Sequence, residues 1–202
     1  MNTNRASYNS IAADWDRARA SFFGRERDYV DAFLDGYPKS SAILDLGCGT
    51  GRPIAEYVLA HGHHITGIDQ ASALLAQARR RFPQATWIEA SLEDVELVEP
   101  YAGIVCWDVL FHIRRSAHAG LLSKMAGNLQ PGGKVMITVG GSDHPPFTDS
   151  MFGHEFFYDS NTPEETLSIL NELGFETVVA EFINQPTSGR DKGRYAIIAR
   201  LR

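Results

Sequence analysis

The sequence contains no stretch of about 18 consecutive apolar residues, so no membrane-spanning helix is expected. Its first residues include Asn, Arg, Ser and Asp and lack the apolar run of a secretory signal, so none is expected. It has only two cysteines, Cys48 and Cys106, which favour a cytoplasmic chain with unpaired thiols over a disulfide scaffold. Neither C-x-x-C nor H-E-x-x-H occurs, so no metal site is expected.

Positive charge is also scarce. The chain has 19 Lys and Arg against 25 Asp and Glu, and its formal net charge is −6. Proteins that bind nucleic acid usually present a basic face, so this balance disfavours a nucleic-acid partner. Its 202 residues, of which 44% are hydrophobic, suffice for one domain with a sizeable core.

The most informative feature present is a glycine-rich turn directly after an apolar run. The run Ala42–Leu46 suits a buried parallel strand, and Gly47-Cys48-Gly49-Thr50-Gly51 follows at once. Alternate glycines let the backbone turn sharply and approach a ligand closely. Pro53 then suits the start of a helix. Together the strand, the loop and the helix start predict a nucleotide-binding turn.

The glycine spacing and two carboxylates narrow the choice of ligand. The spacing is G-x-G-x-G, whereas dinucleotide sites have G-x-G-x-x-G. Asp45 precedes the first glycine by two residues, and a carboxylate there favours a cationic or hydroxyl-bearing ligand over a pyrophosphate. Asp69 follows the loop by about 20 residues, where a carboxylate can accept both ribose hydroxyls of an adenosine. The alternative for Asp69 is a cap on the next helix.

Apolar segments alternate with helical patterns after residue 40, which predicts βα units and a mostly parallel sheet. The expected strands are Ala42–Leu46, His64–Ile68, Thr86–Glu89, Gly103–Trp107, Lys134–Val139, Glu176–Ile183 and Tyr195–Leu201. The last two are joined without a helix, so they are expected to pair antiparallel. Helix starts are expected at Ser116, as an N-cap, and at the capping box that begins with Thr162.

Three strings resemble those of the class I S-adenosylmethionine-dependent methyltransferases. Ile43–Gly51 resembles motif I, and Leu129–Lys134 resembles the L-x-P-G-G turn before the fifth strand. Tyr8–Trp15 is similar to the Y-D-x-x-A-x-x-Y arm, with Asn9 for Asp and Trp15 for the second Tyr. The resemblance implies a single small-molecule methyltransferase domain over residues 1–202. Within it, 1–40 form an N-terminal helical arm or lid, 41–202 a core, and 141–160 a substrate loop.

The fold that this resemblance implies is α/β. It is a Rossmann-like, seven-stranded, mostly parallel sheet with helices on both faces, a C-terminal antiparallel hairpin and the N-terminal arm. The implied cofactor is S-adenosyl-L-methionine, with S-adenosyl-L-homocysteine as product. The residues expected to bind it are Tyr8, Trp15, Asp45, Gly47, Cys48, Gly49, Gly51, Asp69, Gln70, Ser91, Leu92 and Trp107. Ser91 stands where the family often has an acid for the adenine amino group.

The resemblance also bears on the acceptor. No N-P-P-Y or D-P-P-Y follows Trp107, and that motif holds the target nitrogen in amino-methyltransferases of DNA and of some proteins. We therefore expect in-line transfer of a methyl group to a small molecule, by a monomer or homodimer with no nucleic-acid or membrane partner. His112 is the leading catalytic candidate, although a ring that only bonds a backbone carbonyl is equally consistent. His144 and His154 are further candidate bases.

Two aromatic-rich segments lie outside the alternating core and are expected to cover the site. One is the arm, whose Tyr8, Ile11, Trp15 and Arg19 share a helical face. The other is the loop 140–160, which is long for a connection in a compact domain. The alternative is that these aromatics only complete the core edge. Two rival functions also stay open: a nicotinamide-dependent oxidoreductase, and a methyltransferase-like protein that binds a nucleoside without turnover.

Overall fold

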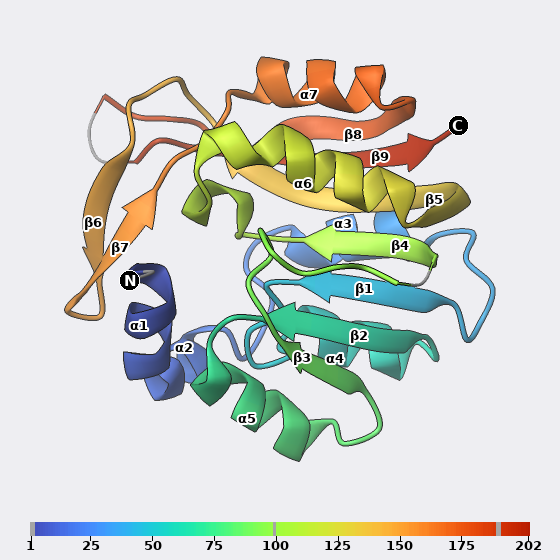
Figure 1. Ribbon diagram of the computed structural model, residues 1–202, viewed down its shortest axis with the longest axis horizontal. Coiled ribbons are helices and arrows are strands. Elements are labelled where there is room, and N and C mark those ends of the chain that lie inside the picture. Colours follow the sequence, from blue (N-terminus) through green and yellow to red (C-terminus); the bar gives the residue numbers. More distant parts are fainter. Residues whose placement is uncertain (1–2, 99, 189–190) are drawn as a thin grey trace.

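Seven strands form one sheet in the computed structural model, which describes residues 3–98, 100–188 and 191–202. In their order across the sheet they are β3 (Thr86–Glu89), β2 (His64–Asp69), β1 (Ala42–Leu46), β4 (Tyr101–Cys106), β5 (Leu129–Gly140), β9 (Arg194–Leu201) and β8 (Phe175–Asn184). The five strands from β3 to β5 pair parallel, and β9 runs antiparallel to both β5 and β8 (Figure 1). The predicted Rossmann-like sheet with its C-terminal antiparallel hairpin is confirmed.

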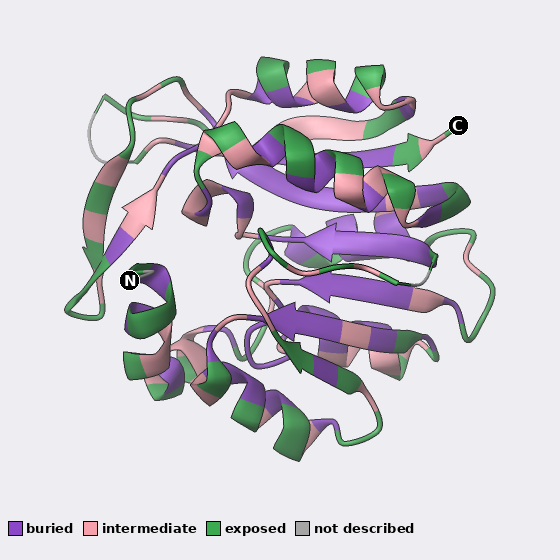
Figure 2. Cartoon of the chain, in the orientation of Figure 1, coloured by how far each residue is buried: buried purple, intermediate pink, exposed green. Residues whose placement is uncertain are grey.

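Helices cover both faces of this sheet. The helices on one face are α3 (Glu26–Leu34), α4 (Ile54–Ala60) and α5 (Ser72–Arg81); those on the other are α6 (Arg115–Gly127) and α7 (Pro163–Glu172). Successive side chains of a strand point to opposite faces, so Ile43 packs with the first group and Leu44 and Leu46 with the second. Figure 2 shows the resulting burial along the central strands. Helix α3 is therefore part of the core, although the predicted arm included it.

The start of β5 contains the predicted glycine turn. Tyr101 pairs with Leu129, but Gly103 pairs with Lys134, so four residues of β5 bulge out opposite one residue of β4. Gly132 lies in this bulge with a φ of 77°, a conformation that favours glycine. The predicted turn is thus an irregularity inside the strand. No helix in the described ranges is long and apolar enough to cross a membrane.

The N-terminal arm consists of two short helices, α1 (Thr3–Ser10) and α2 (Ala12–Ala18), where the sequence indicated one continuous helical face. The chain turns at Ile11, whose side chain is 1% exposed. Ala12, the first residue of α2, packs with Ala71 and Leu74, which holds the arm to the core. Residues 1–2 of the predicted arm lie outside the described residues.

The segment expected to be a loop is instead largely a β-hairpin. Strands β6 (Phe147–Met151) and β7 (His154–Tyr158) form a separate two-stranded sheet, which lies beside α1 (Figure 1). The loop prediction is wrong for these residues because cross-strand pairing of their aromatics stabilises an extended conformation. The carboxyl ends of the parallel strands, the arm and the hairpin meet on one side of the molecule.

Candidate functional site

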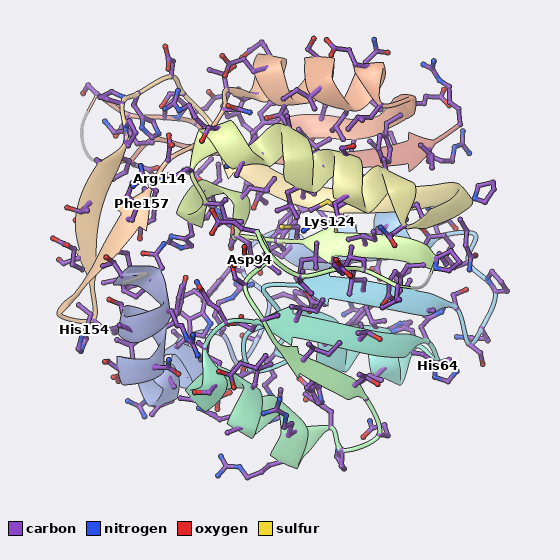
Figure 3. All side chains as sticks on the ribbon, in the orientation of Figure 1. His64, Asp94, Arg114, Lys124, His154 and Phe157 are labelled. Carbon is purple, nitrogen blue, oxygen red and sulfur yellow. The ribbon has the colours of Figure 1, made fainter. Side chains whose placement is uncertain are left out.

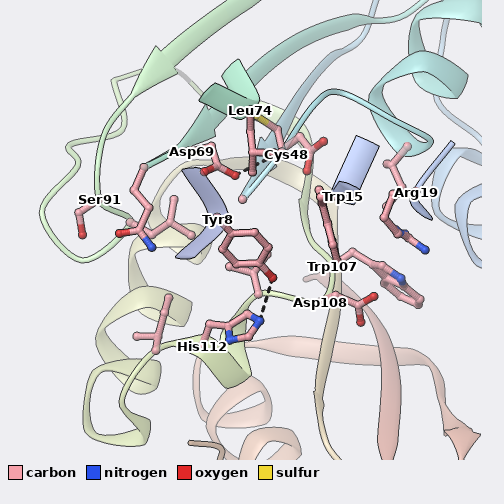
Figure 4. A pocket seen from close by; sticks show the side chains of 18 of the residues that line it. Tyr8, Trp15, Arg19, Cys48, Asp69, Leu74, Ser91, Trp107, Asp108 and His112 are labelled. Atoms are coloured by element: carbon pink, nitrogen blue, oxygen red, sulfur yellow. Dashed lines mark hydrogen bonds between the residues drawn. The ribbon is translucent and has the colours of Figure 1, made fainter. Parts of the chain in front are cut away.

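A hollow of about 930 Å³, counting the space at its mouth, opens at the carboxyl ends of β1, β2 and β4 (Figure 4). We call it the sheet-end hollow. The sequence-predicted residues that line it are Tyr8, Trp15, Asp45, Gly47, Cys48, Gly49, Asp69, Gln70, Ser91, Leu92, Trp107 and His112. Gly51 is the one predicted cofactor-binding residue that does not line it. The fold thus brings together side chains from the arm, the glycine loop and three further strand ends.

The glycine loop owes its shape to backbone conformations that other residues rarely adopt. Gly47, Gly49 and Gly51 have φ values of 75°, 56° and 78°. A Cβ atom on Gly47 would overlap the side chain of Val109, and one on Gly49 would lie 3.5 Å from Trp15 Nε1. A Cβ atom on Gly51 would press on core aromatics at 3.0 Å. Gly51 therefore serves packing beneath the loop, which explains its absence from the hollow.

Asp69 connects the glycine loop to the start of α5. One carboxylate oxygen accepts a hydrogen bond from Gly49 N at 2.9 Å, and the other accepts from Ala71 N at 2.8 Å. Burial raises the pKa of Asp69, and the backbone N–H donors partly offset that rise. Ala71 is the N-cap residue of α5 and this helix has no side-chain cap, so the alternative that Asp69 caps it is wrong. The Asp69 side chain lines the hollow.

Asp45 has a different environment, although it lies nearby. Its side chain is 4% exposed, and no residue in the described part of the chain donates a hydrogen bond to its carboxylate. Burial, with a smaller contribution from the charge of Asp69, raises its pKa to about 7. A buried carboxylate without a donor is costly, so this position favours a cationic group within the hollow.

His112 holds two hydrogen bonds that fix its tautomer. Its Nδ1 lies 3.0 Å from the carbonyl oxygen of Phe157, which can only accept, so Nδ1 carries the proton. Its Nε2 lies 3.0 Å from the Tyr8 hydroxyl, which then donates (Figure 4). Burial lowers the pKa of His112 to about 4, so the ring is neutral at pH 7. The ring therefore makes the expected backbone bond while its other edge faces the hollow.

A buried network of charges forms one wall of the hollow, and sequence reasoning missed it. Glu26, 1% exposed, accepts two bonds from Arg19 Nη1 at 3.0 and 2.9 Å and one from Trp107 Nε1 at 3.2 Å. Arg194 donates to Glu26 at 3.3 Å and to both oxygens of Asp108 at 3.0 and 2.7 Å. Arg19 and Asp108 also line the hollow (Figure 4).

The residues of this network differ in how far the sequence indicated them. Arg19 was on the predicted face of the arm, and Asp108 follows an apolar strand, so both were visible as candidates. Asp108 adopts a φ of 58°, which no sequence pattern indicated. Nothing local connects Glu26 to Arg194.

The other candidate bases lie elsewhere. His154 is exposed where the β6–β7 hairpin turns (Figure 3) and lines neither this hollow nor the second hollow described below. His144 lines that second hollow only. Of the three histidines, His112 alone reaches the sheet-end hollow. Within the described ranges no group of three or more His, Cys, Asp or Glu side chains is arranged to hold a metal ion.

Comparison with known proteins supports the same family. A family model for a methyltransferase domain matches residues 43–133. A curated relative, the dTDP-3-amino-3,4,6-trideoxy-alpha-D-glucopyranose N,N-dimethyltransferase of Streptomyces venezuelae, is 26% identical over 57% of this chain and 52% of its own. The trans-aconitate 2-methyltransferase of Methylobacterium nodulans is 34% identical over 63% of this chain and 50% of its own. The chain thus spans about half the length of the curated relatives it matches.

Solved structures share the fold over nearly the whole chain. The Burkholderia thailandensis 1,6-didemethyltoxoflavin-N1-methyltransferase has a TM-score of 0.72 and 19% identity, and covers 98% of this chain and 87% of its own. The magnesium protoporphyrin IX methyltransferase of Synechocystis has a TM-score of 0.73 and 17% identity, and covers all of both chains. The methyltransferase-domain model thus matches the glycine loop and the strands that follow it, and the solved structures share the fold of the whole chain.

Proposed function

We propose that this protein transfers the methyl group of S-adenosylmethionine to a small-molecule acceptor by in-line displacement. The observation that carries this proposal is the meeting of the glycine loop, Asp45 and Asp69 in one hollow at the strand ends. Ligands of open α/β sheets bind at this position. The small-molecule methyltransferases among its relatives support the same conclusion.

The residues of the sheet-end hollow fit S-adenosylmethionine group by group. Asp45, which lacks a donor, suits the α-ammonium group, and Arg19 suits the carboxylate of the methionine part. Asp69 suits the ribose hydroxyls, and Ser91 and Leu92 suit the adenine. Gly47, Cys48 and Gly49 leave backbone room beside the ligand, and Gln70 lies next to the ribose position. The rings of Tyr8, Trp15 and Trp107 suit the sulfonium, because aromatic faces attract cations.

When bound, this cofactor supplies a methyl group already activated by its sulfonium, whose carbon–sulfur bond breaks as a lone pair of the acceptor forms the new bond. The chain has to orient the acceptor and exclude water. We assign His112 the task of holding the Tyr8 hydroxyl at the hollow, where it orients the acceptor. With a pKa of about 4, His112 is a weak base at neutral pH, which suits an acceptor that needs no deprotonation.

The cellular setting is also part of the proposal. Both cysteines are buried and unpaired, as in cytoplasmic proteins. A formal net charge of −6 agrees with a small-molecule substrate and with no nucleic-acid partner. We propose a cytoplasmic monomer or homodimer.

Ligand binding tests the cofactor assignment. S-adenosylhomocysteine should stabilise the protein against heat, by about 2.7 kcal/mol at a concentration of 100 Kd, and NADH should not. Asp69→Asn should weaken its binding, measured by calorimetry, by at least about tenfold, because the ribose loses a charged acceptor. Asp28→Asn, an exposed position on α3, should bind as the wild type does.

Two results would overturn the assignment. A stabilisation by NADH with none by S-adenosylhomocysteine would favour the oxidoreductase. Binding of S-adenosylmethionine without methylated product over a broad acceptor panel would favour the protein that binds a nucleoside without turnover.

A further inference from the structure

We propose that a second hollow, beneath the β6–β7 hairpin, binds the methyl acceptor, and that this acceptor is a flat conjugated ring carrying a carboxylate. The hollow measures about 920 Å³, counting the space at its mouth. We call it the hairpin hollow; it is lined by Phe111, Gly140, His144, Phe147, Asp149, Tyr158, Asp191, Lys192, Gly193 and Arg194. The acceptor role rests on the proposed function, whereas the binding site itself does not.

Three of its lining rings are nearly parallel. Phe147 and Tyr158 form a cross-strand pair of the hairpin, with ring centroids 5.1 Å apart and planes 14° apart. The ring of Phe111 lies 6.2 Å from that of Tyr158 at 29°. His144 meets Phe147 edge-on at 5.1 Å. Each of the three parallel rings is only half-buried, so apolar area remains for a ligand. Such faces favour a planar partner that can stack.

A positively charged group, the guanidinium of Arg194, lines this hollow. Arg194 uses Nε and Nη2 for Asp108 and Glu26, and no residue that the structure describes accepts a bond from its Nη1. Lys192 lines the same hollow. Nη1 therefore remains to donate a charge-assisted hydrogen bond to a ligand carboxylate.

Two acids also line the hollow and act against an anion. Asp191 is engaged in the β8–β9 connection, where it accepts bonds from Asn184 Nδ2 at 3.1 Å and from Gly193 N at 2.9 Å. Asp149 accepts a bond from Ser150 N at 2.7 Å. Both acids thus direct oxygens to groups of the chain itself, while Arg194 keeps donors available.

The two hollows lie on either side of the short turn Leu110–His112. Asp108 and His112 line the sheet-end hollow, and Phe111, between them in sequence, lines the hairpin hollow. The His112 ring lies 4.8 Å from that of Tyr158. Arg194, from the hairpin hollow, holds the carboxylate of Asp108. An acceptor anchored at Arg194 therefore lies next to the site where the cofactor is proposed to bind, and its reacting atom has to extend past this turn to the Tyr8 hydroxyl to meet the methyl group.

A matched set of probes tests this site on the full chain without cofactor. We would titrate 2-naphthoate, 2-naphthamide and cyclohexanecarboxylate by calorimetry. We expect 2-naphthoate to bind below millimolar Kd, and the neutral amide and the non-planar acid to bind at least about fivefold more weakly. Phe147→Leu, which keeps the site apolar but removes a flat face, should weaken 2-naphthoate about fivefold. Phe152→Leu, at the exposed turn of the same hairpin, should bind it as the wild type does.

The possible outcomes distinguish failure of the proposed binding site from failure of the proposed function. Any of three results overturns the proposed site: equal binding of 2-naphthoate to Phe147→Leu and to the wild type, equal binding of 2-naphthamide and 2-naphthoate, or no binding of 2-naphthoate at millimolar concentration. If 2-naphthoate fails while S-adenosylhomocysteine still binds, the inference falls and the proposed function stands. If 2-naphthoate binds as expected while S-adenosylhomocysteine does not, the binding site stands and its acceptor role falls with the proposed function. Thermal unfolding of each variant confirms that it is folded.

Discussion

Asp69 and Asp45, two carboxylates at the sheet-end hollow, differ in the hydrogen bonds that they receive from the chain. Asp69 receives two backbone N–H bonds, whereas the Asp45 carboxylate receives no bond from the described residues. Burial raises the pKa of Asp45 to about 7, above the value near 3.9 of an unfolded chain. Protonation of Asp45 therefore favours the folded state; this stabilisation is complete below about pH 4 and is lost as the pH rises through 7. At pH 8 the empty site holds an uncompensated charge that a cation would relieve.

A pH dependence of binding follows from this residue. If the ionised form of Asp45 holds the α-ammonium group, affinity for S-adenosylhomocysteine should fall about tenfold from pH 8 to pH 6 as the carboxylate takes up a proton. Asp45→Asn should bind more weakly at pH 8 and lose most of this pH dependence. Calorimetry across the range measures both. An affinity of the wild type that stays constant from pH 6 to pH 8 would separate Asp45 from ligand binding.

At the scale of elements, the side chains of Asn4 and Ser7 fasten the arm to the hairpin, and Ser7 Oγ donates to the carbonyl oxygen of Glu155 at 2.5 Å. Asn4, 2% exposed, donates to the carbonyl oxygens of Phe157 at 3.0 Å and His112 at 3.1 Å, and accepts from Phe157 N at 2.7 Å. Its amide thus pairs with β7 as a neighbouring peptide group would. The aromatics of these segments divide between two roles. Phe156 is fully buried against Tyr8, as the core-edge alternative expects, whereas Phe147 and Tyr158 line the hairpin hollow.

Removal of the Asn4 side-chain amide should loosen the attachment of the arm to the hairpin. Asn4→Ala leaves the Phe157 N–H and the His112 carbonyl oxygen without this partner, a cost of about 1–3 kcal/mol. Amide hydrogen exchange should therefore speed up in residues 3–18 while β1 and β4 keep their protection. Bound S-adenosylhomocysteine should slow exchange of the arm in the wild type if the arm acts as a lid. Ser10→Ala, which loses only a bond within α1, is the matched control. Equal exchange of the arm in Asn4→Ala and wild type would show that Asn4 does not fasten it.

At the scale of the whole molecule, the buried charge network joins parts that are far apart in sequence. Glu26 on α3 connects Arg19 after the arm to Arg194 at the start of β9, and Arg194 continues to Asp108 after β4. Burial acts to raise the pKa of Glu26, but Arg19 and the other donors outweigh it, so the pKa is lowered. Its contribution to stability is therefore present at neutral pH and is lost as the pH falls through this lowered pKa.

The buried charge network predicts that a substitution of similar shape at Glu26 strongly lowers the free energy of unfolding. Glu26→Gln keeps the shape but leaves the buried Arg19 guanidinium without its carboxylate and takes one of two carboxylates from the half-buried Arg194. This should lower the free energy of unfolding by about 3–5 kcal/mol. Glu176→Gln removes an exposed partner of Arg200 and should cost under about 1 kcal/mol. Urea unfolding at pH 7 measures both. A cost for Glu26→Gln as small as that of the surface variant would mean that the network does not hold these segments together.

The sequence by itself determined the sheet and the glycine loop. Buried parallel strands require apolar runs, so Ala42–Leu46 was predicted with its observed bounds. The edge strand Thr86–Glu89, in which only Trp87 is buried, was predicted with its observed bounds from the alternation of strands and helices. Positive φ at Gly47 and Gly49 requires glycine, so the loop could be read as a ligand turn. The capping box at Thr162 was also correct, because its two hydrogen bonds are local. Ser116 was wrong as a cap, since α6 begins one residue earlier with no side-chain cap.

Only the tertiary structure decided how the site is walled and covered. The pairing of β6 with β7, the clamp from Asn4 to Phe157 and the bond from Glu26 to Arg194 each join residues whose partners no local pattern identifies. The last of these spans 168 positions of the chain. Hydrophobic periodicity reports which face of an element is buried, but not which distant side chain it meets. The division of the strand-end region into two hollows, with Arg194 and His112 at their shared wall, follows from those long-range contacts alone.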